Sequence, residues 1–123
     1  MDRRKSAETG KFGEEYTAKY LLENGYEIVK LNYHSQYGEI DIITKKDGVL
    51  SFVEVKTRSK GYMYEPVYAV SRQKREKIIK TAYCYIMETE YDGAVSFDVA
   101  LLVVNGDRVE QFKYMENAFE AIF

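Results

Sequence analysis

The chain is poor in several residue types, and each shortage excludes a class of protein. Its 123 residues contain one cysteine, Cys84, which excludes an intrachain disulfide framework and a cysteine-rich zinc site. A single cysteine also fits a reducing compartment, so we expect a cytoplasmic protein. The lone histidine, His34, lies in a polar segment, and no serine or cysteine arrangement accompanies it. We expect this histidine to be solvated rather than catalytic.

Long apolar runs are also missing. No segment is long enough to span a membrane, and the charged start of the chain lacks the apolar core of a signal peptide. The net charge is only −2, from 18 basic and 20 acidic side chains, so nucleic-acid binding would have to depend on local patches. With 46% hydrophobic residues, we expect the chain to bury its core as one domain over residues 1–123.

The most informative segment covers residues 38–58, G-E-I-D-I-I-T-K-K-D-G-V-L-S-F-V-E-V-K-T-R, which predicts two apolar strands. Asp47-Gly48 between them favours a two-residue type I′ turn, so that Lys46 pairs with Val49. Counting outward from this pair sets four charged residues opposite one another on one face: Asp41 with Glu54, and Glu39 with Lys56. A four-residue loop would keep these faces, whereas a three- or five-residue loop would separate the pairs.

This arrangement of charge has two explanations. Opposed carboxylates repel, and a hard divalent cation such as Mg²⁺ or Mn²⁺ between Asp41 and Glu54 would relieve that repulsion. Lys56 could then orient or activate a water, or stabilise charge on a phosphate. The alternative is a pair of cross-strand salt bridges, in which Lys56 answers Glu39 or Glu54. The residue pattern alone leaves both explanations open.

A helix is predicted over Ser6–Asn24, closed by Gly25. Its apolar stripe is expected to consist of Ala7, Gly10, Glu14, Ala18, Leu21 and Leu22. A glutamate on such a stripe needs a partner. Glu14 either forms an ordinary ion pair near the helix start or points at the same cation as Asp41 and Glu54.

The remaining elements follow from similar patterns. Strands are predicted over Tyr26–Tyr33, Val95–Val104 and Arg108–Tyr114, and Asn117–Phe123 is expected to form a short amphipathic helix. Within the second of these strands, Asp98 is a candidate buried acid that we expect to pair with arginine or lysine. The segment Thr57–Tyr68 is predicted to be a packed loop, with a flap or a partner surface as alternatives.

Ser71 is predicted to be the N-cap of a second helix that runs to Thr89. Its first half is rich in positive charge: Arg72, Lys74, Arg75, Lys77 and Lys80. This face is either a phosphate-binding surface or simply a solvated basic face. The order of elements is α-β-β-β-α-β, then a strand and a short helix, and it predicts an α/β fold with a mixed sheet flanked by helices.

Two motifs resemble those of known nucleases. Asp41 followed by Glu54-Val55-Lys56 resembles the D…(D/E)xK signature of restriction-endonuclease-like nucleases, whose core is also α-β-β-β-α-β. More closely, the chain resembles the YraN family, small bacterial proteins related to Holliday-junction resolvases. That resemblance covers nearly the whole chain and is carried by Gly13-Glu14, Gly38-Glu39-Ile40-Asp41, Phe52-Val53-Glu54-Val55-Lys56-Thr57-Arg58, Lys74, Phe97-Asp98-Val99 and Asn117-Ala118-Phe119.

The resemblance implies a role for each matching residue. Asp41 and Glu54 would be ligands of Mg²⁺ or Mn²⁺, with the Val55 carbonyl completing the shell, and Lys56 would act on the attacking water. Other residues would assist: Glu14 by joining the site, Glu39 by supporting Lys56, and Arg58, Lys74 and Arg72 by contacting phosphates. The implied function is a metal-dependent endonuclease acting on DNA, including branched or junction DNA, and a homodimer would place two sites on two strands. The alternative is a weakly active or inactive module of the same fold that binds nucleic acid or a partner.

Overall fold

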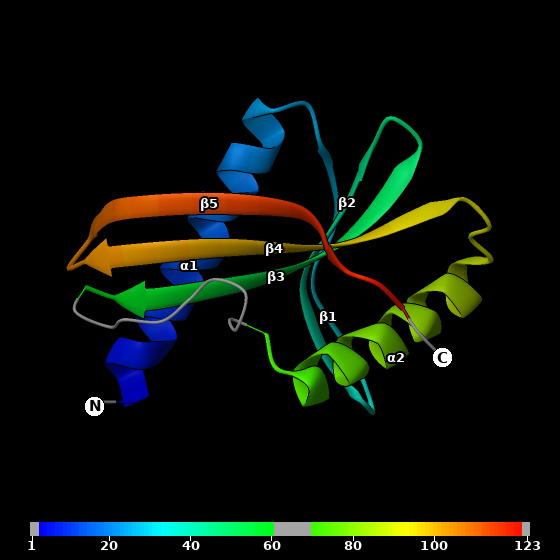
Figure 1. Cartoon of the computed structure of the whole chain (residues 1–123), viewed down its shortest axis with the longest axis horizontal. Coiled ribbons are helices and arrows are strands. Elements are labelled where there is room, and N and C mark those ends of the chain that lie inside the picture. Colours follow the sequence, from blue (N-terminus) through cyan, green and yellow to red (C-terminus); the bar gives the residue numbers. More distant parts are fainter. Residues whose placement is uncertain (1–2, 61–69, 122–123) are drawn as a thin grey trace.

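The computed structural model describes residues 3–60 and 70–121, with the backbone alone for residues 3–8. The elements are α1 (Arg3–Glu23), β1 (Glu27–Ser35), β2 (Gly38–Lys46), β3 (Val49–Ser59), α2 (Arg72–Thr89), β4 (Ala94–Asn105) and β5 (Arg108–Phe119) (Figure 1). The strands form one sheet in the order β1-β2-β3-β4-β5. Strands β3 and β4 run parallel, and the other neighbours run antiparallel. The predicted mixed α/β fold with an additional C-terminal strand is therefore confirmed.

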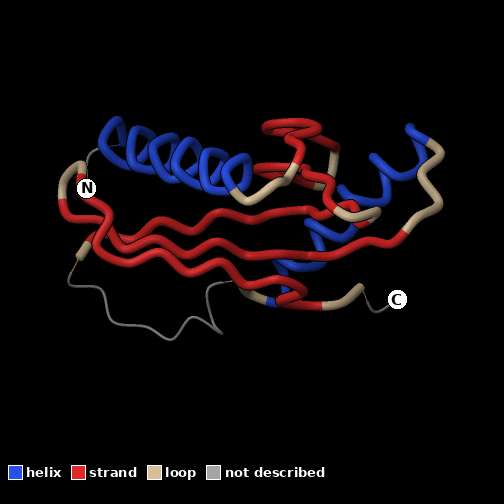
Figure 2. Tube along the Cα trace, turned by 90° about the horizontal axis from the view of Figure 1, so that it is seen from above, coloured by secondary structure: helices blue, strands red, loops and turns tan. Residues whose placement is uncertain are grey.

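The two helices cover opposite faces of this sheet. Leu21 of α1 packs in a buried cluster with Ile42 of β2 and Val53 of β3. On the other face, Ile78 of α2 packs with Ile43 and Phe52, which are the next residues on the same two strands. In Figure 2 the long helix α1 lies along one side of the strands, and α2 runs obliquely past the strands at the right-hand end of the view. The middle strands β2, β3 and β4 bury residues on both faces because a helix covers each face, whereas most residues of the edge strands β1 and β5 are not buried.

The hairpin between β2 and β3 has the predicted register. Lys46 pairs with Val49, and the ladder continues to Ile42 opposite Val53. Within residues 38–59, all of which the structure describes, the ladder ends there, before the predicted Asp41–Glu54 and Glu39–Lys56 pairs. Beyond this point β2 remains paired with β1 while β3 follows β4. Figure 1 shows the two pairs of strands separating near the centre of the molecule, which creates a fork in the sheet.

The helix ends follow their local sequence signals. Gly25 has φ of +85°, and its N–H donates to the carbonyl of Leu22 while that of Tyr26 donates to the carbonyl of Leu21. These are the two hydrogen bonds of a Schellman motif, which glycine at this position favours. Ser71 caps α2 as predicted, because its Oγ accepts from the N–H of Lys74 at 3.2 Å. Both helix boundaries could therefore be placed to within a few residues.

The buried stripe of α1 differs from the predicted one. Gly13, Thr17 and Leu21 are buried, Glu14 is half-buried beside them, and Leu22 is 58% exposed. The buried face is therefore rotated by about one residue from the face chosen on apolar character. The reason is a close approach between α1 and β3, in which a small residue, Gly13, takes the innermost position.

Two predicted boundaries near the ends of strands were wrong. Thr57, placed in a loop, belongs to β3, which pairs with β4 as far as Ser59 opposite Val104; residues 61–69 of that predicted loop lie outside the described residues. The short helix predicted from Asn117 is not formed in residues 117–121, because β5 continues to Phe119. Phe119 pairs with Phe97 of β4 and its ring stacks on that of Phe97 at 5.2 Å. Packing against β4 thus overrides the local helical pattern.

Candidate active site at the fork of the sheet

Asp41 lies on β2 where the ladder with β3 ends. Its Oδ2 accepts a hydrogen bond from the backbone N–H of Val55 at 2.8 Å. The carboxylate therefore satisfies a donor of β3 that lies just beyond the last ladder pair. Burial raises the pKa of Asp41, and the negative charge of Glu39 raises it further, while the Val55 N–H and the charges of Lys74 and Lys56 act in the opposite direction.

Glu54 lies on β3 at the fork and points toward the α2 layer. It is 5% exposed, and its Oε1 lies 3.7 Å from Nζ of Lys74 in the first turns of α2. Burial raises the pKa of Glu54 to about 7, and the charge of Asp41 contributes in the same direction. The carboxylates of Asp41 and Glu54 therefore lie close together, as the sequence predicted, and the charge of Asp41 disfavours the ionised form of Glu54.

Lys56 follows two residues after Glu54 and is half-buried. Burial lowers the pKa of Lys56, and the charges of Lys74 and Arg58 also lower it, while Glu54 and Asp41 raise it. Lys56, Lys74 and Arg58 therefore lie close enough to act on one another electrostatically. The predicted grouping of Asp41, Glu54 and Lys56 is observed, although the ladder register that led to it stops one pair short.

Glu14 approaches the same point from the opposite layer. It is half-buried on α1, and burial raises its pKa to about 7, with further contributions from the charges of Asp41 and Glu39. The fork makes this convergence possible. Because β2 leaves β3 beyond Val53, a side chain from α1 and another from α2 can reach one cluster of carboxylates from the two faces of the sheet.

Asn32 on β1 belongs to this cluster, and sequence reasoning missed it. Its amide faces two carboxylates, and with the amide nitrogen assigned to that side it donates to Oε1 of Glu14 at 2.8 Å and to Oε1 of Glu39 at 2.9 Å. Its φ of +52° is a left-handed conformation that asparagine tolerates better than most residues. An asparagine inside a predicted strand was the available signal, because strands are depleted in this residue.

Glu39 was predicted to support Lys56. The polar contacts that the described residues give Glu39 are instead with Asn32 and with His34, whose Nε2 lies 3.9 Å from Oε1 of Glu39. The side chain of His34 is 68% exposed, as expected for a solvated histidine. Glu39 thus lies on the β1 side of the fork, whereas Lys56 lies on the β3 side.

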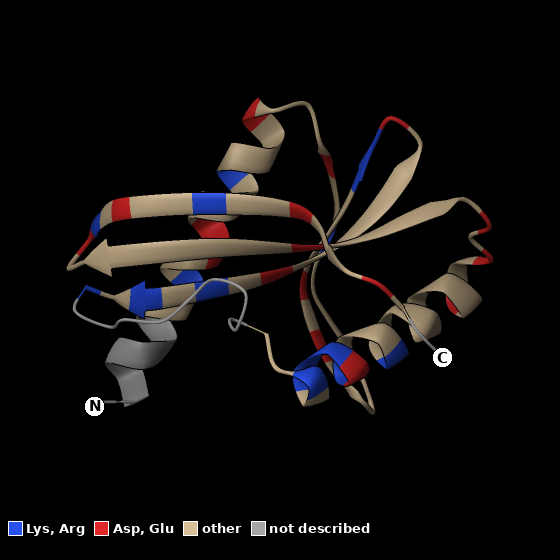
Figure 3. Cartoon of the chain, in the orientation of Figure 1, with Lys and Arg blue, Asp and Glu red and all other residues tan. Residues whose placement is uncertain are grey.

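The predicted phosphate contacts lie on two elements that flank the fork. Arg58 is half-buried on β3, two residues beyond Lys56, and Lys74 pairs with Glu54. Arg72 is highly exposed on the first turn of α2, with its Nε 3.5 Å from Oε1 of Glu76. Figure 3 shows positive charge on the outer half of β3 and at the start of α2, the two elements that carry these residues.

Asp98 does not take part in this cluster, and its expected cationic partner is absent from the described residues. It is 1% exposed on β4 and accepts from the hydroxyls of Ser96 at 2.5 Å and Tyr114 at 2.6 Å, and from the N–H of Asn117 at 2.9 Å. Three donors can stabilise a buried carboxylate without a counter-ion. Asp98 therefore links β4 to β5 and has a structural role.

Asp41 and Glu54 form a suitable donor set for a hard divalent cation. Their oxygens match the preference of Mg²⁺ and Mn²⁺, and a cation between them would offset the burial that disfavours ionisation of both carboxylates and the charge of Asp41 that disfavours ionisation of Glu54. In residues 3–60 and 70–121 no three His, Cys, Asp or Glu side chains converge as a ready ligand shell. Mg²⁺ commonly takes one or two carboxylates and completes its shell with waters and phosphates, so two carboxylates fit it.

Neither helix that the structure describes is long and apolar enough to cross a membrane.

Residues 13–102 match the model of the uncharacterised protein family UPF0102. A UPF0102 protein of Campylobacter fetus is 43% identical over 105 residues, which cover 85% of this chain and 88% of the relative. A relative from Helicobacter pylori strain P12 is 41% identical over 92% of each chain, and one from Syntrophomonas wolfei is 38% identical over 91% of this chain and 97% of its own. The chain therefore belongs to the UPF0102 family, which is the YraN family that its motifs resemble.

Proposed function

We propose that this protein is a nuclease that uses Mg²⁺ or Mn²⁺ to hydrolyse phosphodiester bonds in DNA, with branched or junction DNA as the first substrate to test. The observation that carries the proposal is the meeting of Asp41, Glu54 and Lys56 at the fork, with Lys74 beside Glu54. Phosphoryl transfer needs oxygen ligands for a metal ion and positive side chains close to them. Asp41 and Glu54 supply the oxygens, and Lys56 and Lys74 supply the positive charge.

Asp41, Glu54 and the Val55 carbonyl would hold the metal ion. When bound, the ion would supply Lewis-acid activation of the phosphate. The N–H of Val55 holds the Asp41 carboxylate against β3, so that this ligand is positioned in advance. Lys74 neutralises part of the negative charge of Glu54, and it would exchange that carboxylate for a phosphate when substrate and cation arrive.

Lys56 would orient or activate the attacking water. Burial lowers the pKa of its ammonium group, which makes Lys56 a better proton acceptor than an exposed lysine, while the charge of Glu54 acts in the opposite direction. Arg58, two residues along the same strand, would contact a neighbouring phosphate. Although the net charge of the whole chain is −2, the positive charge beside the fork offers a polyanion a local binding surface (Figure 3).

Cleavage of defined substrates tests this proposal. Purified protein is incubated with four-way junction, flap and linear DNA, with Mg²⁺, with Mn²⁺ and with EDTA. We expect metal-dependent cleavage that Asp41→Asn and Lys56→Met each reduce by at least about 100-fold, since each removes a group that acts on the reacting atoms. Cleavage that survives both substitutions would assign the activity to another protein in the preparation.

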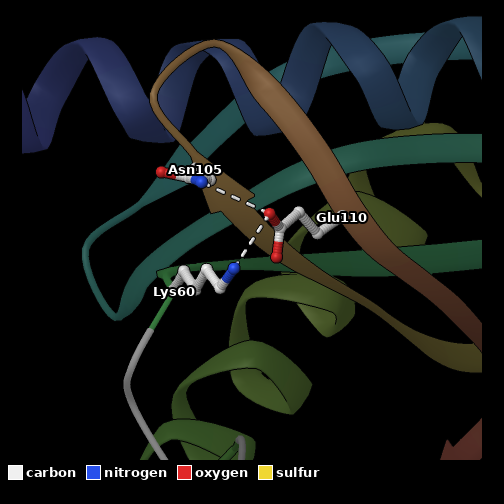
Figure 4. A network of polar contacts seen from close by, with 3 residues as sticks. All are labelled: Lys60, Asn105 and Glu110. Carbon is white, nitrogen blue, oxygen red and sulfur yellow. Dashed lines mark hydrogen bonds and ion pairs between the residues drawn. The ribbon is translucent and has the colours of Figure 1, made fainter.

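Lys60 offers a matched control for Lys56. It directly follows β3, and its Nζ lies 3.4 Å from Oε1 of Glu110, which also accepts from Asn105 at 3.3 Å. Figure 4 shows the side chains of Lys60 and Asn105 directed at Glu110. Lys60→Met also removes one lysine from this edge of the protein but leaves the fork unchanged, so cleavage should be retained.

The second candidate function is a binding module that performs no hydrolysis. The observation in its favour is that Lys74 already pairs with Glu54, so the ammonium group of Lys74 offsets the carboxylate charge that a metal ion would otherwise offset. A titration of the protein with Mn²⁺ in a calorimeter separates the two functions. Binding at micromolar to sub-millimolar concentration supports the nuclease, and no heat at millimolar Mn²⁺ supports the binding module.

A further inference from the structure

Asn32 interrupts the pairing of β1 with β2 directly across from Asp41. Leu31 pairs with Ile42 and Tyr33 pairs with Ile40, so by count Asn32 stands opposite Asp41, but these two residues do not form a ladder pair. Asn32 instead adopts φ of +52°. Asp41 bonds the Val55 N–H across the fork, and the amide of Asn32 bonds two other carboxylates. The irregularity in β1 therefore coincides with the candidate site.

The amide of Asn32 is a shared donor between two like charges. With the amide nitrogen assigned to the side of the carboxylates, its two hydrogens serve one carboxylate each, with Nδ2 at 2.8 Å from Oε1 of Glu14 and 2.9 Å from Oε1 of Glu39. Glu14 belongs to α1 and Glu39 to β2, so this one side chain of β1 connects three elements. A neutral amide holds the carboxylates in place and leaves their charge unchanged, whereas a lysine would cancel part of that charge. The amide itself therefore adds no positive charge that would compete with a cation at the fork.

We propose that Asn32 is a positioning residue that holds Glu14 and Glu39 through the two hydrogens of its amide and so sets the place of Glu14 beside Asp41. This inference rests on the proposed nuclease function for its consequence, since the family resemblance implies that Glu14 joins the metal-binding carboxylates. Groups that orient metal-binding side chains typically change metal affinity or activity by about 10- to 100-fold when they are removed.

Asn32→Gly is the informative substitution. Glycine adopts a positive φ readily, so the variant keeps the backbone of β1 and removes only the amide. Asn117 supplies the matched control, because it also has φ of +52° and lies on β5, where its N–H bonds Asp98 away from the fork. Both variants should unfold within a few degrees of the unaltered protein.

Mn²⁺ affinity and cleavage are measured for these two variants. We expect Asn32→Gly to weaken Mn²⁺ binding by about 10- to 100-fold and to lower kcat more than it raises KM, while Asn117→Gly changes either by less than about 2-fold. In a Glu14→Gln background, Asn32→Gly should have little further effect, because the two residues act through one contact. Equal Mn²⁺ affinity in Asn32→Gly and the unaltered protein would overturn the inference, even if the protein cleaves DNA.

A metal-free measurement tests the contact independently of the function. The two side-chain amide protons of Asn32 give separate NMR signals in a 15N-labelled protein. We expect Glu14→Gln to move one of these signals and Glu39→Gln to move the other, with the Asn117 signals unchanged. If neither substitution moves the Asn32 signals, the inference falls. If the signals move but the protein binds no metal, the positioning contact stands and the proposed nuclease function falls.

Discussion

Gly13 of α1 lies directly against Thr57 of β3. A Cβ added at Gly13 would stand 1.9 Å from Oγ1 of Thr57 and 3.2 Å from its Cβ. The contact sets how closely α1 approaches the sheet, and Glu14 is the next residue along the helix. We therefore expect the contact between Gly13 and Thr57 to determine whether the neighbouring Glu14 reaches the fork.

Replacing Gly13 with alanine should therefore destabilise the protein. Alanine favours a helix by about 1 kcal/mol over glycine, but overpacking against Thr57 costs about 1–3 kcal/mol. We expect a net loss of up to about 2 kcal/mol in the free energy of unfolding, measured in urea, together with weaker Mn²⁺ binding as Glu14 moves outward. Thr57→Ala in the same chain should restore part of the stability, because it removes the nearest atom.

Gly10 provides the control for this prediction. It lies one helical turn before Gly13, and a Cβ added there meets nothing within 4 Å. Gly10→Ala should therefore raise stability by up to about 1 kcal/mol. If Gly13→Ala stabilises the protein as much as Gly10→Ala does, the close approach of α1 to β3 is not a constraint on this fold.

The stability of the metal-free protein should depend on pH through Glu54. Its pKa is raised from 4.5 to about 7 in the folded protein, so folding favours the protonated carboxyl. The stabilisation that this provides is fully present below pH 4.5 and is lost as the pH rises through 7. The Glu54→Gln variant has no carboxyl to ionise at this position and cannot lose this stabilisation. From pH 4.5 to above pH 7, its free energy of unfolding should therefore rise relative to that of the unaltered protein by roughly 3 kcal/mol.

Urea unfolding at pH 4.5, 6 and 8, with and without Mg²⁺, checks this expectation. Mg²⁺ should recover stability at pH 8 in the unaltered protein, because a cation favours the ionised carboxylate, and should have little effect on Glu54→Gln. Parallel curves of unfolding free energy against pH for the two proteins would show that the pKa of Glu54 is not raised in the folded state, which would contradict this prediction.

Tyr114→Phe should destabilise the protein without acting on the site. The hydroxyl of Tyr114 donates to Oδ2 of the buried Asp98 at 2.6 Å, and this neighbour contributes to raising the pKa of Tyr114 after burial itself. Loss of one of the three donors to a buried carboxylate costs about 1–3 kcal/mol. Tyr16→Phe is the comparison, because Tyr16 is 39% exposed on α1, and its change should stay below about 0.5 kcal/mol. Equal effects would show that Asp98 does not depend on Tyr114.

Arg58 and Lys74 should contribute to DNA affinity through phosphate contacts. Affinity is measured by fluorescence anisotropy over a range of salt concentrations, with EDTA present to prevent cleavage. Arg58→Ala and Lys74→Ala should each reduce the slope of log affinity against log salt by about 1, whatever the DNA sequence. Lys19, which pairs with Glu23 at 4.0 Å on α1, is the control position. An unchanged slope in both site variants would remove these residues from the binding surface.

Much of the fold followed from local signals. Asp47-Gly48 set the register of the β2–β3 hairpin, and Gly25 and Ser71 marked helix ends, because turns and caps depend on a few neighbouring residues. The C-terminal helix was predicted wrongly because its residues have a helical pattern, yet Phe119 gains more from stacking on Phe97 in the adjacent strand. Local preference loses when a long-range packing partner is available.

For the candidate site, the sequence by itself determined the chemical groups and their spacing along β2 and β3, because residues two apart on a strand share a face. It also marked Glu14 through the family resemblance. Only the tertiary structure decided that the sheet forks at Asp41, that Lys74 meets Glu54, and that Asn32 joins Glu14 to Glu39. These contacts connect residues far apart in the chain, and they depend on how two helices pack on a twisted sheet, which no local pattern encodes.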